Sequence, residues 1–328
     1  MESTPAPASR GGGGRGEGPS RVITKNALED LYCRLNRREF VHPDPLEVLY
    51  DYPDPLDREV VGLVAASLAY GRVKGILNSV HAVLARMPAP RRFVTETPPE
   101  QIRAAFAGFK HRFATGDQLA ALLIGAGRLI ARHGSLGAAF AAACKPADET
   151  VIPALSAFVA ELIDLSKTDA TALAPERRRL SRSPGRPKGA LGPEAPPTEP
   201  PKRGDSGGIG EHLLPRPERG SACKRLNLWL RWMVRRDAVD PGGWTGVSPA
   251  QLIVPLDVHM HRICRALGLT QRNAADLRTA VEITDAFRRF APDDPVRYDF
   301  ALTRLGIRPG PDADLAAFLA KSGTPRQP

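Results

Sequence analysis

The spacing of apolar residues is the feature that most limits how this 328-residue chain can fold. Apolar residues recur every three or four positions through most of the sequence, which places them on one face of a helix. One-by-one alternation of apolar and polar residues, the pattern of a half-buried strand, is absent. Apolar residues make up 42% of the chain, enough for a sizeable core. The sequence therefore predicts an all-α fold.

Local signals mark where individual helices begin and end. Asp54 can cap a helix whose first residue is Pro55, and Gly71 suits the left-handed turn that ends it. A second helix is predicted to follow directly, over 73–87, and to stop before Pro88. The same signals predict further helices over 98–107, 116–133, 149–165, 222–236, 258–267, 273–290 and 296–305.

Residues 166–208 differ in composition from the rest of the chain. They are crowded with Pro, Gly, Ser and Arg and contain too few large apolar residues to offset the entropy of ordering them. We expect a disordered insertion there, and loose tails over 1–20 and 309–328. The insertion then divides the chain into a helical lobe over 21–165 and a second helical part over 209–308.

The net charge of the chain is +10, which favours an anionic partner such as nucleic acid. A solvated basic surface without a partner explains the same charge. No segment reaches the roughly 18 apolar residues that a membrane span needs, and the N-terminus has no signal-peptide core. We expect a cytoplasmic monomer with no membrane contact.

The cysteine pattern argues against a metal or disulfide framework. The four cysteines form no CxxC pair, so neither a disulfide scaffold nor a zinc or iron–sulfur site is predicted. Asp257, His259 and His261 cannot converge on a metal, because alternate residues on a helix point about 200° apart. We therefore expect no metal and no cofactor.

Two residues at predicted helix starts, Lys224 and Asp257, are the candidate catalytic pair. A helix over 222–236, followed by a return segment rich in Pro and Gly, allows Asp257 to come back beside Lys224. A desolvated lysine amine can attack an electrophilic carbon to form a Schiff base, and a carboxylate can stabilise developing positive charge. The alternative is structural: Asp257 is then an ordinary N-cap and Lys224 a solvated first-turn lysine.

Two segments resemble a known superfamily, the helix-hairpin-helix DNA glycosylases. VPLDVHMHRICRALGL is similar to the part of those enzymes in which an aspartate caps a helix and a His, an Arg and a Leu-Gly-Leu ending follow. Asp257, His259, Arg262 and residues 267–269 match that pattern. LVAASLAYGRVKGILNSVHAVLARMP resembles the early helix pair, whose turn approaches the duplex. The resemblance implies a two-lobed helical bundle of the DNA glycosylase type.

The chain also departs from that superfamily. It lacks the Gly-rich hairpin before the catalytic lysine and the four-cysteine iron–sulfur loop that many members carry. The step of 33 positions from Lys224 to Asp257 is instead similar to that of the archaeal 8-oxoguanine DNA glycosylases. With RPERGSACKRLNLWLRWMVR and DPVRYDFALTRLG, the chain is also similar to an uncharacterised bacterial family of conserved hypothetical proteins over 25–308, without the insertion.

The glycosylase resemblance implies a function in DNA repair by base excision. Lys224 would attack C1′ of a deoxyribose and Asp257 would stabilise the sugar cation, in a glycosylase and AP lyase acting on duplex DNA. Two other classes stay open at this point. One is a non-catalytic nucleic-acid-binding protein on the same scaffold; the other is a small-molecule enzyme that uses Lys224 in Schiff-base chemistry.

The turn between the first two strong helices is the expected DNA contact. There Tyr70, Arg72 and Lys74 accompany the first backbone N–H groups of a helix, an arrangement suited to phosphate. A tight turn with solvated basic residues is the alternative. On the helix over 222–236, a polar stripe adds Arg231 and Arg235 as candidate phosphate contacts, or else as part of an ordinary solvated face.

Four further residues are expected to support the site. Asn227 lies on the polar stripe of the lysine helix, and His259 is expected to support the aspartate or to pack locally. Trp229 and Trp232 either stack on an extruded base or pack in the core.

Overall fold

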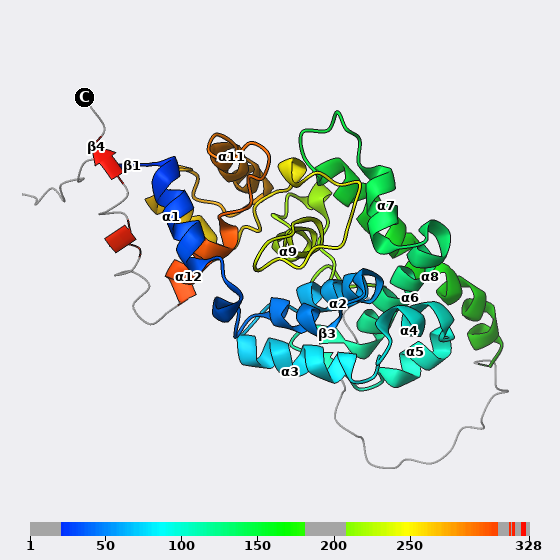
Figure 1. The fold of residues 1–328 in the computed structure, drawn as a ribbon. Coiled ribbons are helices and arrows are strands. Elements are labelled where there is room, and N and C mark those ends of the chain that lie inside the picture. Colours follow the sequence, from blue (N-terminus) through cyan, green and yellow to red (C-terminus); the bar gives the residue numbers. More distant parts are fainter. Residues whose placement is uncertain (1–20, 181–207, 308–314, 316, 319–322, 326–328) are drawn as a thin grey trace, which may run out of the picture.

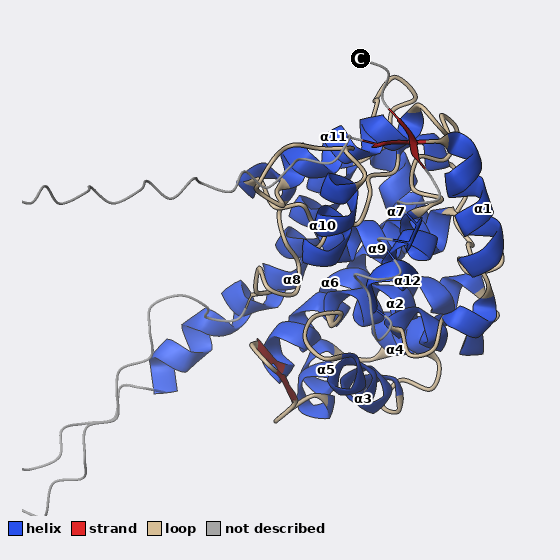
Figure 2. Cartoon of the chain, turned by 90° about the vertical axis from the view of Figure 1, so that its left-hand side faces the viewer, coloured by secondary structure: helices blue, strands red, loops and turns tan. Residues whose placement is uncertain are grey.

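The computed structural model describes residues 21–180, 208–307, 315, 317–318 and 323–325. Within these residues the chain is mostly helical (Figure 2), which confirms the prediction of an all-α fold. Strands are limited there to two short antiparallel pairs: β1 (Arg21–Ile23) with β4 (Gly323–Pro325), and β2 (Lys110–His111) with β3 (Ala114–Thr115).

Helices α2 to α8 follow α1 along the chain, and four of them pack on α6. Their bounds are α2 (Pro55–Ser67), α3 (Val73–Leu84), α4 (Pro90–Glu96), α5 (Pro99–Ala105), α6 (Gly116–His133), α7 (Leu136–Ala143) and α8 (Ile152–Leu180). Helix α6 contacts α4, α5, α7 and α8. A Cβ atom at Gly127 of α6 would lie 1.9 Å from the Val94 carbonyl oxygen, so only glycine allows α4 to pack this closely.

The remaining helices are α1 (Lys25–Leu35), α9 (Lys224–Val234), α10 (Val258–Ala266), α11 (Leu277–Arg288) and α12 (Asp299–Ile307). Helix α12 contacts α1 and α10, whereas α9 packs on α2 (Figure 1). Segments from both sides of the expected insertion therefore pack on one another, and residues 21–165 do not close into a lobe of their own. The buried apolar side chains form one continuous cluster through both parts.

Short 3-10 helices lie in the connections of the described chain. They are η1 (Arg38–Phe40), η2 (Pro45–Asp51), η3 (Pro217–Arg219) and η4 (Pro249–Gln251). Asp44 caps η2 by accepting a hydrogen bond from the Leu46 N–H at 3.0 Å.

Observed and predicted helix bounds agree best where local capping signals are strong. Helix α6 spans the predicted 116–133, because Thr115 and Gln118 form a capping box at its start and Gly134 ends it at φ +90°. Helix α8, by contrast, runs to Leu180, past its predicted end at 165. Residues 166–180 include three Ala, three Arg and two Leu, which favour helix, and this part of the expected insertion is helical.

The C-terminal tail also differs from the expectation of a loose segment. Strand β4 pairs with β1 near the start of the chain, and Leu315 and Phe318 are buried. These two residues are three positions apart, the spacing that puts side chains on one helix face. The other residues of this tail, the tail 1–20 and residues 181–207 lie outside the described residues.

Candidate active site

Four helices begin at one cavity of about 530 Å³. Its walls include the first residue of each of them, namely Val73 of α3, Lys224 of α9, Val258 of α10 and Asp299 of α12. A helix start carries partial positive charge, and the starts of α3 and α9 receive no side-chain cap from the described residues, whereas Asp257 caps α10. The volume is within the range of small-molecule and cofactor sites, roughly 300–1,000 Å³. The cavity therefore suits a ligand that carries negative charge.

Lys224 and Asp257 form an ion pair in the wall of this cavity. Lys224 Nζ lies 3.0 Å from Asp257 Oδ2, so the irregular return segment does bring the two residues together. Asp257 Oδ1 accepts hydrogen bonds from the backbone N–H groups of His259 and Met260, both at 2.9 Å, and caps α10. One carboxylate oxygen thus holds the helix, and the other faces the lysine.

The protonation of Asp257 follows from these contacts. Burial by itself would raise the pKa of its carboxyl group. The Lys224 ammonium and the Met260 N–H outweigh burial and hold the pKa of Asp257 below its ordinary value. The side chains of Lys224 and Asp257 are 33% and 26% exposed, so a ligand in the cavity can reach both.

Asp299 is a site residue that the sequence reasoning missed. It is 2% exposed, forms an ion pair with Arg231, and lines the cavity beside the lysine pair. Burial raises the pKa of Asp299, as does the Asp257 charge, whereas the Arg231 charge lowers it. Its only sequence signal was an acidic residue at the start of the helix in DPVRYDFALTRLG.

Three buried polar atoms of cavity-lining residues have no hydrogen-bond partner among the described residues. They are Trp232 Nε1, Asp299 Oδ1 and Arg304 Nε, two donors and one acceptor. A buried polar group that stays unpaired costs about 1–3 kcal/mol, so native proteins pair nearly all of them. Each of these atoms is covered by protein, so they are polar groups within the cavity wall that the described residues leave unpaired, rather than groups open to the cavity.

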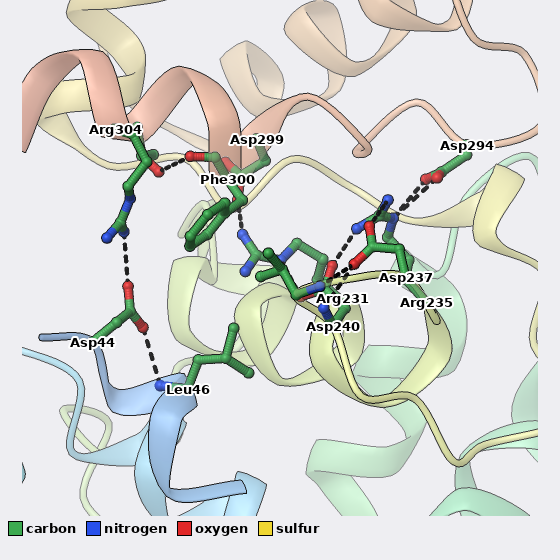
Figure 3. A network of polar contacts seen from close by, with 12 residues as sticks. Asp44, Leu46, Arg231, Arg235, Asp237, Asp240, Asp294, Asp299, Phe300 and Arg304 are labelled. Atoms are coloured by element: carbon green, nitrogen blue, oxygen red, sulfur yellow. Dashed lines mark hydrogen bonds and ion pairs between the residues drawn. The ribbon is translucent and has the colours of Figure 1, made fainter. Parts of the chain in front are cut away.

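Arg231 and Arg235 do not lie on a solvated face, so the alternative of an ordinary solvated stripe is wrong, whereas their expected contact with phosphate stays a prediction. They are 4% and 3% exposed and share the fully buried Asp240 (Figure 3). Arg231 also pairs with Asp299, and Arg235 pairs with Asp294. The carboxylates neutralise the polar stripe of α9 inside the protein, and Arg231 is at the same time one of the residues that line the cavity.

This buried network holds the floor of the cavity in place. Burial raises the pKa of Asp240 to about 6, against the lowering effect of Arg231 and Arg235. Arg304, in the cavity wall, extends the contacts to the other side by donating to Asp44 Oδ2 at 2.8 Å and to the Phe40 carbonyl at 3.1 Å (Figure 3).

The turn after α2 forms part of the cavity wall, and its residues differ in exposure. Tyr70, which is partly buried, lines the cavity and donates its hydroxyl hydrogen to the His111 carbonyl at 3.0 Å. Arg72 and Lys74 are exposed next to the cavity-lining Val73. The start of α3 receives no side-chain cap within the described chain, so its first N–H groups stay available.

The four residues expected to support the site lie in three different places: the core, the turn before α9 and the cavity wall. Trp229 is fully buried and donates to the Glu59 carbonyl at 3.0 Å, so it packs in the core and cannot stack on a base. Asn227 donates to the Ala222 carbonyl at 3.0 Å and holds the turn before α9. Trp232 lines the cavity, and His259 is exposed at the cavity wall while its backbone N–H supports Asp257.

A family comparison covers nearly all of these elements. The family model described as a protein of unknown function, DUF2400, matches residues 44–183 and 201–308. The chain belongs to the DUF2400 family. The comparisons with curated proteins and with solved structures found no match.

The DUF2400 match includes every residue of the candidate site. Tyr70, Lys224, Asp257 and Asp299 lie inside the matched ranges, whereas α1 and the β1–β4 pair lie outside them. The similarity to an uncharacterised family, inferred from the sequence over 25–308, is confirmed over the matched ranges 44–183 and 201–308.

The described residues contain neither a metal-binding cluster nor a helix that could span a membrane. Among the described residues, no three His, Cys, Asp or Glu side chains gather as a metal ion would require. In the same residues, none of the helices has the length and hydropathy to cross a membrane.

Proposed function

We propose that this DUF2400 protein is a DNA-repair enzyme of the base-excision type, a glycosylase and AP lyase that acts on a damaged base in duplex DNA. The observation that carries the proposal is the 3.0 Å pair of Lys224 Nζ and Asp257 Oδ2 in the wall of a cavity where four helices begin. The scaffold is then a two-lobed helical bundle of the DNA glycosylase type, as the sequence resemblance implies.

The chemistry uses one amine and one carboxylate. Once Lys224 has lost its proton, Nζ attacks C1′ of an extruded nucleotide, and the bond from C1′ to the base breaks with its electron pair going to the base. The base takes up a proton as it leaves. Asp257 stabilises the positive charge that develops at the sugar. Opening of the sugar ring gives a Schiff base on Nζ, and β-elimination then cleaves the strand on the 3′ side.

Charge around the cavity supports DNA as the ligand. Arg72 and Lys74 stand exposed beside the uncapped start of α3, where a backbone phosphate finds both charge and N–H donors. The net charge of +10 also favours binding to the polyanionic DNA backbone.

A non-catalytic nucleic-acid-binding role on the same scaffold is the second candidate. It is favoured by the ion pair itself, because the Asp257 carboxylate already holds the lysine side chain at 3.0 Å, as in a purely structural salt bridge. In that case the pair would only join the starts of α9 and α10.

Borohydride trapping separates the two candidates. The protein is incubated with a panel of duplexes that each carry one lesion or one abasic site, and sodium borohydride reduces any Schiff base to a stable cross-link. Cross-linking to one or more duplexes supports the enzyme. Binding without any cross-link across the panel would leave the non-catalytic role.

A further inference from the structure

A two-residue hairpin turn exposes an aromatic side chain close to the cavity. Lys110 pairs with Thr115 and His111 with Ala114, which leaves Arg112 and Phe113 as the turn. Phe113 is 69% exposed, and Arg112 has φ +52°, in the left-handed region that residues other than glycine rarely adopt. An exposed phenylalanine on a strained turn is a costly arrangement, and strain of this kind concentrates at functional sites.

The base of this hairpin is held rigidly against the protein. His111 is 6% exposed, and its Nδ1 lies 2.8 Å from Ser79 Oγ of α3. Its Nε2 lies 3.2 Å from the Tyr70 carbonyl oxygen, and the two rings meet edge to face with centroids 4.8 Å apart. The tip that carries Phe113 is therefore presented on a fixed support.

The hairpin tip lies at the edge of the cavity. A Cβ atom at Gly71, a cavity-lining residue with φ +107°, would lie 2.9 Å from Arg112 Cδ, so the Arg112 side chain rests on this turn. The described chain leaves three large apolar side chains exposed, Leu56, Phe113 and Val258. Val258 lines the cavity, and the Phe113 ring lies 5.8 Å from the guanidinium carbon of Arg112, whose side chain rests on the cavity-lining Gly71.

The surroundings of the hairpin tip are basic. Residues 70–75 and 110–115 together contain Arg72, Lys74, Lys110 and Arg112 and no acidic residue. Basic side chains around an exposed aromatic ring suit a polyanion with stacked bases better than they suit a second copy of a protein that carries a net charge of +10.

We propose that Phe113 is a wedge that inserts between base pairs of duplex DNA and fills the space left by the nucleotide that enters the cavity. Apolar side chains that enter a base step unstack it and kink the duplex, and stacking on an aromatic ring offsets part of that cost. The inference rests on the proposed function, since it takes duplex DNA as the ligand. Tyr70, the aromatic residue of the neighbouring turn, has its hydroxyl bound to the hairpin and so supports the tip that carries Phe113.

The test uses a duplex that binds but cannot react. It carries a tetrahydrofuran analogue of an abasic site and, opposite to it, 2-aminopurine, a base whose fluorescence rises when it unstacks. We expect the wild-type full chain to raise this fluorescence on binding. Phe113→Ala should lose most of the increase and bind this duplex about tenfold more weakly, and Phe113→Trp should restore both. Leu56→Ala, which removes another exposed apolar side chain, is the control and should behave as the wild type.

Unchanged fluorescence and affinity in Phe113→Ala would overturn the wedge. A wild-type protein that does not bind the duplex at all would also overturn the wedge. The wedge would fail too if the only effect of Phe113→Ala were the loss of a dimer in sedimentation. Trapping on a true abasic duplex reports separately on the proposed function. If the wild type unstacks 2-aminopurine but forms no borohydride cross-link, the proposed enzyme activity fails and the wedge stands. If cross-links form while Phe113→Ala unstacks normally, the wedge fails alone.

Discussion

Lys224 and Asp257 form an ion pair, with Nζ 3.0 Å from Oδ2, that joins the start of α9 to the start of α10. The two residues are 33 positions apart in the sequence. Because Asp257 Oδ1 is already occupied by two backbone N–H groups, the carboxylate has a fixed orientation and Oδ2 faces the lysine. Because the two oxygens of the Asp257 carboxylate have different partners, mutation can separate its role as a helix cap from its role beside Lys224.

Replacing the lysine tests whether it is the nucleophile. Lys224→Gln should abolish the borohydride cross-link to lesion or abasic duplexes and leave duplex binding nearly unchanged, because glutamine has no amine that can form a Schiff base. Trapping and a binding titration are measured on the same duplex. Lys25→Gln is the matched control, since Lys25 is also the first residue of a helix but is exposed and lies outside the cavity wall. A Lys224→Gln variant that still cross-links is not compatible with the assignment.

Arg225, the neighbour of Lys224, would be a poor control. It is partly buried, donates to the Ser67 carbonyl at 2.9 Å, and its guanidinium lies 5.0 Å from the centre of the Tyr70 ring. Its loss would disturb the cavity wall, and a defect in Arg225→Ala would say little about Lys224.

Removing the charge of Asp257 while keeping its shape separates capping from catalysis. Asparagine is a good N-cap, so Asp257→Asn should lower the free energy of unfolding by less than about 1 kcal/mol. Turnover should fall by orders of magnitude if the carboxylate stabilises the sugar cation. Urea unfolding and single-turnover base release measure the two effects. Equal turnover for the two proteins would return Asp257 to the role of an ordinary cap.

The same variant should change how stability depends on pH. The pKa of Asp257 is lower in the folded than in the unfolded chain, so between the two values the unfolded chain binds more protons. The stabilisation is present above the unfolded pKa, about 3.9, and is lost as the pH falls through the folded value. Asp257→Asn should therefore lose less stability than the wild type between about pH 5 and pH 3. Asp240, whose pKa is raised to about 6, contributes the opposite slope in both proteins and cancels in the difference.

The basic turn after α2 is expected to hold phosphate. The double variant Arg72→Ala, Lys74→Ala should bind every duplex sequence more weakly and flatten the plot of log K against log salt by about 0.9 for each lost phosphate contact. A control that removes the same charge from α1, Lys25→Ala with Arg34→Ala, should leave the salt slope unchanged, because both residues are exposed away from the cavity. Identical slopes for the two double variants would remove this turn from the DNA face.

The buried network below the cavity is expected to be structural. Arg235→Ala leaves the fully buried Asp240 with one partner fewer and should cost about 3–5 kcal/mol of unfolding free energy. Arg236→Ala, at the exposed next position, should stay within about 0.5 kcal/mol. Chemical denaturation measures both. A small loss for Arg235→Ala would mean that water reaches the network and that the site floor is less rigid than its burial indicates.

Sequence reasoning succeeded where a structure depends on contacts within one or two turns. The bounds of α6 follow from Thr115, Gln118 and Gly134, and the cap of α10 follows from Asp257 alone. It missed α1, α4 and α7. Helices α4 and α7 have only seven and eight residues and depend on packing against other elements, whereas α1 has 11 residues and a local cap at Thr24 that was not recognised.

The surroundings of the site could not be predicted in the same way. A polar stripe on α9 looks identical in sequence whether water or carboxylates neutralise it. Only the fold brings Asp240, Asp294 and Asp299 to Arg231 and Arg235, and so makes the stripe part of a buried network.

The sequence by itself determined the all-α fold, most of the helix positions and the candidate pair at two helix starts, because helical periodicity and capping act over three or four residues. The tertiary structure alone decided that Lys224 faces Asp257, that Asp299 shares their cavity, and that Phe113 is exposed at its edge. Those relationships join residues far apart in the chain, and their geometry depends on how whole helices pack rather than on any local pattern.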